Sequence, residues 1–116
     1  MTEQAKRPTV VISSDTMGAG PEELGRILLK SFIHSLTELD ASPQAVIFLN
    51  SGATLTCEGA GTLDDLRLLE QKGTAVFTCG TCANYFGVQD KTAVGVITNM
   101  YDIAQRMAGA ERLINI

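Results

Sequence analysis

Short apolar runs alternate along the chain with longer amphipathic segments. Runs of apolar and β-branched residues, typical of buried strands, cover residues 9–13, 45–49, 74–78, 93–97 and 112–116. Helical spacing of apolar residues covers 21–39, 63–72 and 103–108, and a shorter helix is predicted to end at Phe86. On the first helix the predicted core positions are Leu24, Ile27, Leu28, Phe32, Leu36 and Leu39.

The alternation of strands and helices predicts the fold class. Parallel strands joined by right-handed helical crossovers give an α/β three-layer sandwich with a mainly parallel sheet of about five strands. We see no repeat, low-complexity linker or second domain. The expected organisation is a disordered N-terminal tail over residues 1–7 and a single domain over 8–116.

Unusual residues gather in four segments that follow predicted strands. In parallel α/β sheets ligands bind outside the carboxyl ends of the strands, so these segments are predicted to meet at one edge. For most of them turn formation and helix capping are the competing explanation, and the Gly18-x-Gly20 loop fits either an anion site or a flexible helix start. The expected substrate-binding residues are Asp15, Thr16, Met17, Gly18, Asn50, Ser51, Gly52, Gly80, Thr81, Thr98 and Asn99.

Charge and composition remove several classes of function. The 116 residues contain 9 Lys and Arg against 13 Asp and Glu, a net charge of -4, so the electrostatic drive for nucleic-acid binding is absent. The longest uninterrupted apolar run covers only residues 45–49, far below the ~20 residues of a membrane span, and the polar start does not resemble a signal peptide. We expect a cytoplasmic protein with neither nucleic-acid nor membrane partners.

Three cysteines carry the candidate chemistry. Cys79 and Cys82 form a C-x-x-C at a predicted strand-to-helix junction, where unpaired amides favour the thiolate of Cys79 and leave Cys82 as a resolving thiol. The alternatives are two small hydrophobes capping the strand, or half of a zinc site. Only Cys57 and His34 remain as further sulfur or nitrogen ligands, so we expect no metal and no cofactor. Cys57 is expected either near Cys79 or as a buried spectator.

Four motifs in order carry a family resemblance. The stretches SSDTMGAGPEELGRILLKSFIHSLTELD, FLNSGATLTCEG, CGTCANYFGV and VGVITNMYDI make the chain similar to the DsrE/DsrF-like domain at the C-terminal end of YedF-type proteins, often labelled selenium metabolism proteins. The resemblance runs from about residue 8 to residue 116 and implies a DsrE-like fold. It further implies a persulfide on Cys79, because sulfur-relay members carry a glycine eight residues after that cysteine, as Gly87 is here.

The resemblance also implies partners. YedF-type proteins usually carry a preceding TusA-like domain, which this sequence lacks, so a separate sulfur donor or acceptor protein, possibly TusA-like, is expected. Superfamily members commonly form trimers or hexamers, and we expect a homo-oligomer with Phe86, Met100 and Tyr101 as interface residues. The function predicted is a sulfur or selenium carrier, acting as a sulfurtransferase or in a sulfur relay. The alternative is a non-catalytic ligand-binding or assembly module, favoured by the absence of histidine from the four loops.

Overall fold

Every strand of the sheet runs parallel to its neighbours. A computed structural model describes residues 7–116, so residues 1–6 of the expected tail lie outside the described residues. The sheet order is β4-β3-β2-β1-β5. In the register of the central strands, Val10 lies beside Val46 and Val46 lies beside Val76. This arrangement confirms the predicted α/β fold. The strands are β1 (Thr9–Ile12), β2 (Ala45–Phe48), β3 (Ala75–Cys79), β4 (Val96–Thr98) and β5 (Leu113–Asn115).

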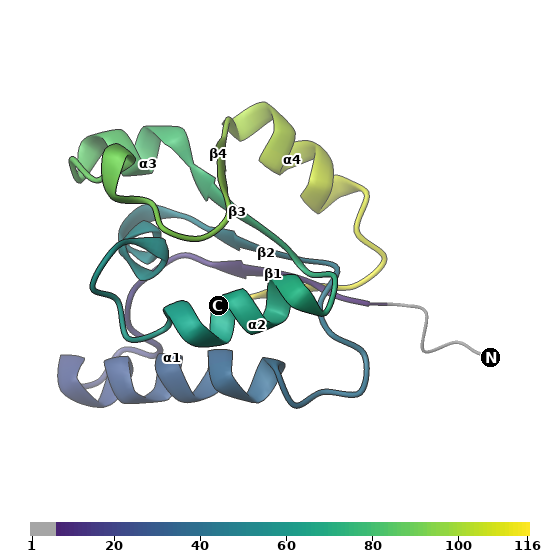
Figure 1. Ribbon diagram of the computed structural model, residues 1–116, viewed down its shortest axis with the longest axis horizontal. Helices are drawn as coiled ribbons and strands as arrows, with labels where there is room; N and C mark the ends of the chain where they lie inside the picture. The colour runs from purple at the N-terminus through teal and green to yellow at the C-terminus, as the bar shows by residue number, and fades with distance from the viewer. Residues whose placement is uncertain (1–6) are drawn as a thin grey trace.

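Helices cover both sides of the sheet, which gives the three expected layers (Figure 1). Helices α1 (Glu22–Leu36) and α2 (Leu63–Gln71) lie on one side, and α3 (Gly80–Tyr85) and α4 (Met100–Ala108) lie on the other. Two short 3-10 helices, η2 (Asn50–Thr56) and η3 (Gln89–Lys91), complete the fold.

The first described residue already contacts the folded domain. The guanidinium of Arg7 donates hydrogen bonds to the carbonyls of Ser42 at 2.8 Å, Pro43 at 2.9 Å and Gly73 at 3.1 Å. These carbonyls belong to the turns that precede β2 and β3. Arg7 therefore ties the entry to β1 to the amino edge of the sheet.

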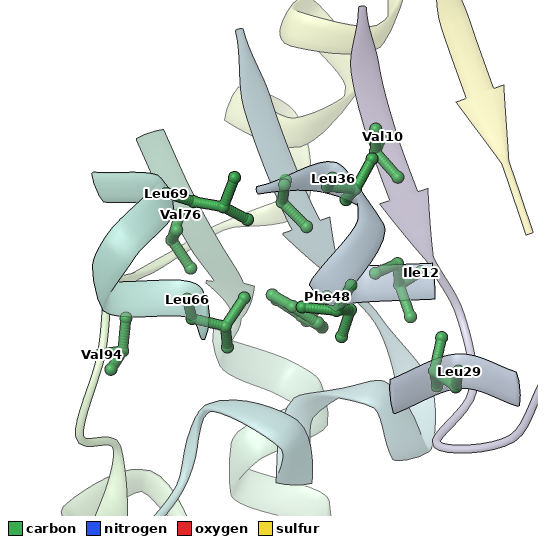
Figure 2. Close-up of a cluster of buried hydrophobic side chains, with 11 residues drawn as sticks. Val10, Ile12, Leu29, Leu36, Phe48, Leu66, Leu69, Val76 and Val94 are labelled. Carbon is green, nitrogen blue, oxygen red and sulfur yellow. The ribbon is translucent and has the colours of Figure 1, made fainter. Parts of the chain in front are cut away.

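Two separate cores form because side chains alternate along each strand. The larger core lies between the sheet and the α1–α2 layer (Figure 2). The smaller core lies on the α4 side and includes Val11, Ile47, Phe77, Cys79 and Ile103. The central strands are thus buried on both faces, as their continuous apolar runs predict. The larger core contains Val10, Ile12, Leu29, Ile33, Leu36, Val46, Phe48, Leu66, Leu69, Val76 and Val94.

The buried face of α1 differs from the predicted one. Leu24, Ile27 and Leu28 are 49%, 59% and 41% exposed. Of the other predicted core positions, Leu36 is buried, and Phe32 is partly buried and packs against the larger core. The face that packs on the sheet consists instead of Gly25, Leu29, Ile33 and Leu36.

Gly25 explains why the sequence pattern does not indicate this face. A Cβ built on Gly25 would lie 2.8 Å from the Cβ of Thr16, so the loop after β1 packs directly on the helix backbone. The backbone N–H of Met17 also donates to the carbonyl of Gly25 at 3.0 Å. A glycine adds neither bulk nor apolar surface to a helical stripe, so the sequence pattern favours the neighbouring face, which has more apolar residues.

The segment after β2 is also more ordered than the expected loop. Inside η2 the hydroxyl of Thr54 donates to the carbonyl of Ser51 at 2.8 Å, and that of Thr56 donates to Ala53 at 3.0 Å. Each bond spans three residues, which matches the repeat of a 3-10 helix. Small hydroxylated residues, which the sequence pattern associates with loops, here stabilise a short helix.

Both edges of the sheet are short. Strands β4 and β5 have three residues each, and their side chains Val96, Ile97, Leu113 and Ile114 are all exposed. Gly95, which precedes β4, has a φ of +80°, and a Cβ there would lie 2.6 Å from the carbonyl oxygen of Val76. Because Gly95 has no side chain, the segment that enters β4 packs directly against the backbone of β3.

The observed face of α1 predicts that truncating two adjacent leucines changes the free energy of unfolding by very different amounts. Leu29→Ala should lower the free energy of unfolding by about 2–5 kcal/mol, because it removes a fully buried side chain. Leu28→Ala changes the helix in the same way at a solvent-facing position, and its effect should stay within about 0.5 kcal/mol. Urea denaturation followed by circular dichroism measures both. A larger loss for Leu28→Ala would restore the face expected from the sequence pattern.

Candidate functional site

The two cysteines of the C-x-x-C lie at the carboxyl edge of the sheet, on the same side as α4. Cys79 is the last residue of β3, pairs with Thr98 of β4, and serves as the N-terminal boundary of α3. Its side chain is part of the smaller core, and the residue is only 1% exposed. The sequence placed Cys79 just beyond the strand, and the parity of β3 instead turns its side chain into the core.

Cys82 lies one helical turn further along α3 and is half-buried. Its sulfur packs at the margin of the smaller core and accepts a hydrogen bond from the backbone N–H of Asn50, with an N–Sγ distance of 3.0 Å. Asn50 follows β2 directly and has a φ of +53°, the only described non-glycine residue with a positive φ. Two strand-end segments thus meet at one sulfur.

The electrostatic environment of Cys82 has opposing contributions. Burial raises the pKa of the Cys82 thiol above its ordinary value, the N–H of Asn50 lowers the pKa, and the neighbouring Cys79 thiol raises it again. The net pKa is raised. The hydrogen bond from Asn50 is therefore the contact that offsets the cost of ionising a partly buried sulfur.

Cys82 opens into a pocket of about 640 Å³. Among the described residues its lining carries no charged side chain, and it includes the aromatic residues Tyr85, at the end of α3, and Phe86, directly after it. The rings of Tyr85 and Phe86 meet edge to face, with centroids 5.3 Å apart at 85°. Cys79 does not line the pocket. The lining residues are Ser13, Leu49, Asn50, Thr81, Cys82, Tyr85, Phe86 and Met100.

Of the residues expected to bind substrate, the structure brings Asn50 and Thr81 to this pocket. Sequence reasoning missed Ser13, Leu49 and Tyr85 as pocket residues, and placed Phe86 and Met100 only at a subunit interface. A signal was present for the aromatic pair, because positions three and four residues after Cys82 lie on the same helical face as its sulfur.

Several of the other expected residues have structural roles. The side chain of Asn99 accepts the backbone N–H of Asp102 at 2.8 Å and caps α4, while the hydroxyl of Thr98 donates to the Asp102 carboxylate at 2.8 Å. Thr98 and Arg106 hold the pKa of Asp102 below its ordinary value. The competing explanation for Thr98 and Asn99, helix capping, accounts for these contacts.

Gly52 and Gly80 permit close packing. A Cβ on Gly52 would lie 2.7 Å from the carbonyl oxygen of Ile12, and one on Gly80 would lie 3.2 Å from Cγ2 of Ile97. Gly87, with a φ of +68°, ends the turn after α3. The spacing of eight residues from Cys79 therefore measures the length of this short helix and its closing turn.

The loop after β1 forms a different site. Asp15 accepts a hydrogen bond from the hydroxyl of Ser51 at 3.2 Å and lines a second pocket of about 260 Å³ together with Arg26 and Lys30. Thr16 and Met17 contact α1 at Gly25, as described above, and Gly18 turns at a φ of +87° in the exposed loop. None of these four residues lines the pocket of Cys82.

Cys57 and His34 stand apart from the dithiol. Cys57 is 5% exposed, and its thiol donates to the carbonyl of Ala53 at 3.4 Å. His34 lies on the exposed side of α1, where Nδ1 is 3.1 Å from the Asp65 carboxylate, which raises the pKa of the imidazole above its ordinary value.

Within residues 7–116, no three His, Cys, Asp or Glu side chains come together as metal ligands. In the same range no helix is both long and apolar enough to cross a bilayer.

Fold and site together define an α/β sandwich protein with two free thiols at the carboxyl edge of a parallel sheet. Comparison with protein families and with curated proteins finds no match to this chain.

Solved structures share the fold over almost the whole chain. The ychN protein from E. coli has a TM-score of 0.71 at 17% identity, covering 96% of this chain and 99% of its own. MTH1491 from Methanobacterium thermoautotrophicum, a protein of unknown function, gives 0.69 at 19% identity, with 95% and 98% coverage. BT1422 from Bacteroides thetaiotaomicron, a conserved protein of unknown function, gives 0.68 at 13%, with 97% coverage of both. At these identities the likeness defines the fold, and function has to be argued from the site.

The different burial of the three cysteines predicts an order of alkylation. In the native protein iodoacetamide should modify Cys82 first, because only its sulfur opens into a pocket, while Cys57 and Cys79 should react after denaturation. Because its pKa is raised, the rate at Cys82 should still be climbing above the pH at which an exposed thiol has levelled off. Peptide mass spectrometry after timed labelling identifies each site. Native labelling of Cys79 before Cys82 would contradict the geometry.

Proposed function

We propose that this protein carries sulfane sulfur, or selenium, on the thiol pair formed by Cys79 and Cys82. The observation that carries the proposal is the meeting of two free cysteines at the carboxyl edge of the sheet, with one sulfur open to a pocket and hydrogen-bonded to Asn50. A sulfur carrier needs a thiol that partners can reach and that can exist as a thiolate. Cys82 meets the first requirement, and the N–H of Asn50 helps with the second.

The resemblance to DsrE/DsrF-like and YedF-type sequences supports the same chemistry. In that resemblance Cys79 bears the persulfide, Cys82 resolves or modulates it, and a TusA-like protein is the donor or acceptor. The fold shared with ychN, MTH1491 and BT1422 is compatible with this assignment and says nothing of sulfur. The proposal assigns the reaction to the cytoplasm, where thiols are kept reduced. Whether the protein acts as a sulfurtransferase or as a passive carrier depends on its donor.

Uptake of sulfur by the dithiol is directly measurable. After incubation with a low-molecular-weight persulfide, wild type should gain the mass of one sulfur atom, and the Cys79→Ser, Cys82→Ser double variant should gain none. Cys57→Ser is the matched control and should load as wild type does, since Cys57 lies outside the pocket. Intact-protein mass spectrometry measures all three.

Two results would count against the carrier. Equal loading of the double variant would place the sulfur elsewhere. Absence of loading in wild type would favour the alternative function, a non-catalytic module that binds a small ligand or assembles with other proteins.

We further propose that the protein forms a homo-oligomer through an aromatic patch at the mouth of the pocket, made of Tyr85, Phe86, Met100 and Tyr101. These four side chains are 84%, 39%, 53% and 74% exposed, which leaves a group of large apolar residues uncovered on α3 and the start of α4. Three of them also line or border the pocket of Cys82.

The oligomer predicts a mass above that of the 12.4 kDa chain in light scattering at micromolar concentration. Tyr101→Glu should shift the mass toward the monomer, because it places a charge in an apolar contact. Leu24→Glu, on the exposed apolar side of α1, serves as the control and should keep the wild-type mass. A monomeric wild type would refute the proposal.

A further inference from the structure

Cys79 and Cys82 are not equivalent, although the C-x-x-C pattern presents them as a pair. Cys79 is 1% exposed and packs with Phe77 and Ile103 in the smaller core, whereas Cys82 is half-buried and lines the 640 Å³ pocket. An incoming molecule that enters the pocket meets the sulfur of Cys82. It reaches Cys79 only by displacing core side chains.

The backbone conformation of Asn50 directs its N–H toward the sulfur of Cys82. Its φ of +53° is uncommon for a residue with a side chain, and asparagine is among the few that tolerate it. This conformation ends β2, starts η2 and aims the backbone N–H at Sγ of Cys82, 3.0 Å away. The close fit of Gly52 against the carbonyl oxygen of Ile12 holds η2 in place two residues later.

Among residues 7–116, no charged side chain lines the pocket around this sulfur. The short helix η2 contains no titratable side chain. The titratable groups beside Cys82 are the Cys79 thiol at the end of β3 and the Tyr85 phenol on α3. The carboxylate of α4, that of Asp102, is bound by Thr98 and Arg106. The N–H of Asn50 is thus the polar contact that the structure aims at this sulfur.

We infer that Cys82 is the thiol that receives sulfur from the donor, and that Asn50 is the residue that positions and polarises it, with Cys79 as the second thiol beneath. This inference rests on the proposed carrier function and reverses the assignment of the two cysteines that the family resemblance implies. Asn50 acts through its backbone and is a positioning residue.

The transfer balances without a further reactant. The Cys82 thiolate attacks the outer sulfur of a persulfide R–S–SH, the donor S–S bond breaks, and R–S⁻ leaves with the electron pair. The product is Cys82–S–SH, in which the outer sulfur keeps its proton. The uncharged, aromatic wall of the pocket favours a donor whose persulfide is presented by an apolar group over a strongly charged one.

The role of Asn50 is tested in a Cys57→Ser, Cys79→Ser background, where Cys82 is the only thiol. Asn50→Gly keeps both the N–H and the left-handed conformation, and its alkylation rate against pH should match the background. Asn50→Val disfavours that conformation and should move the N–H away from the sulfur. Its profile should move to higher pH, with a rate about tenfold lower at neutral pH, the size expected for losing a hydrogen bond to a charged group.

Two checks keep this result interpretable. Unfolding of Asn50→Val would expose the thiol and speed alkylation, so misfolding cannot imitate the expected slowing. In denaturant all three proteins should react at one rate. A native Asn50→Val profile that coincides with the Asn50→Gly profile would overturn the role of Asn50.

The entry role of Cys82 is tested with single variants and the low-molecular-weight persulfide. Cys82→Ser should take up sulfur at least about tenfold more slowly than Cys79→Ser, because its two remaining thiols, Cys57 and Cys79, are both buried. The inference is overturned if Cys82→Ser loads normally while Cys79→Ser does not, and the carrier function survives that result. Conversely, a wild type that takes up no sulfur removes the carrier function, while the alkylation profiles still decide whether Asn50 positions Cys82.

Discussion

Burial of the three central strands on both faces is the constraint on which the rest of the structure depends. Because side chains alternate along a strand, β1, β2 and β3 must supply buried residues toward both faces, and their apolar side chains divide between the two cores. The last residue of β3 follows the same rule. Cys79 shares the parity of Phe77 and therefore points into the core beneath α4, and the next turn of the chain brings Cys82 out at the pocket.

The fold was predictable from the sequence because strand runs and helix stripes are local patterns, and both were strong enough to give a parallel five-stranded sheet. The core face of α1 was not predictable from the sequence. It depends on Gly25, whose role comes from its tertiary contact with Thr16, and helical periodicity does not record such a contact. For the candidate site, the sequence predicts that the loops after the strands meet at the carboxyl edge, and Asn50, Thr81 and Cys82 line one pocket there. Asp15 lines a different pocket because the loop after β1 leaves the sheet on another side. No local sequence pattern indicates the side on which a loop leaves the sheet.

Under the proposed carrier function, the features of the pocket would favour sulfur exchange over tight binding. It has an uncharged lining, a partly buried sulfur whose ionisation is opposed by burial, and one backbone donor that offsets this cost. A thiolate in such surroundings is less stable than in water and gains from forming a bond to an incoming sulfur. Thr98, Asn99 and Asp102 complete the edge by fixing the start of α4, so the wall that contains Met100 is anchored independently of α3.

The three-residue strands at the two edges of the sheet have a consequence for the behaviour of the protein at high concentration. Exposed apolar edge strands invite pairing with other chains, and Val96, Ile97, Leu113 and Ile114 would be a hazard in longer strands. A strand added to β4 or β5 would find a ladder only three residues long and would gain few hydrogen bonds. The brevity of the edges thus limits fibril-like growth by strand addition.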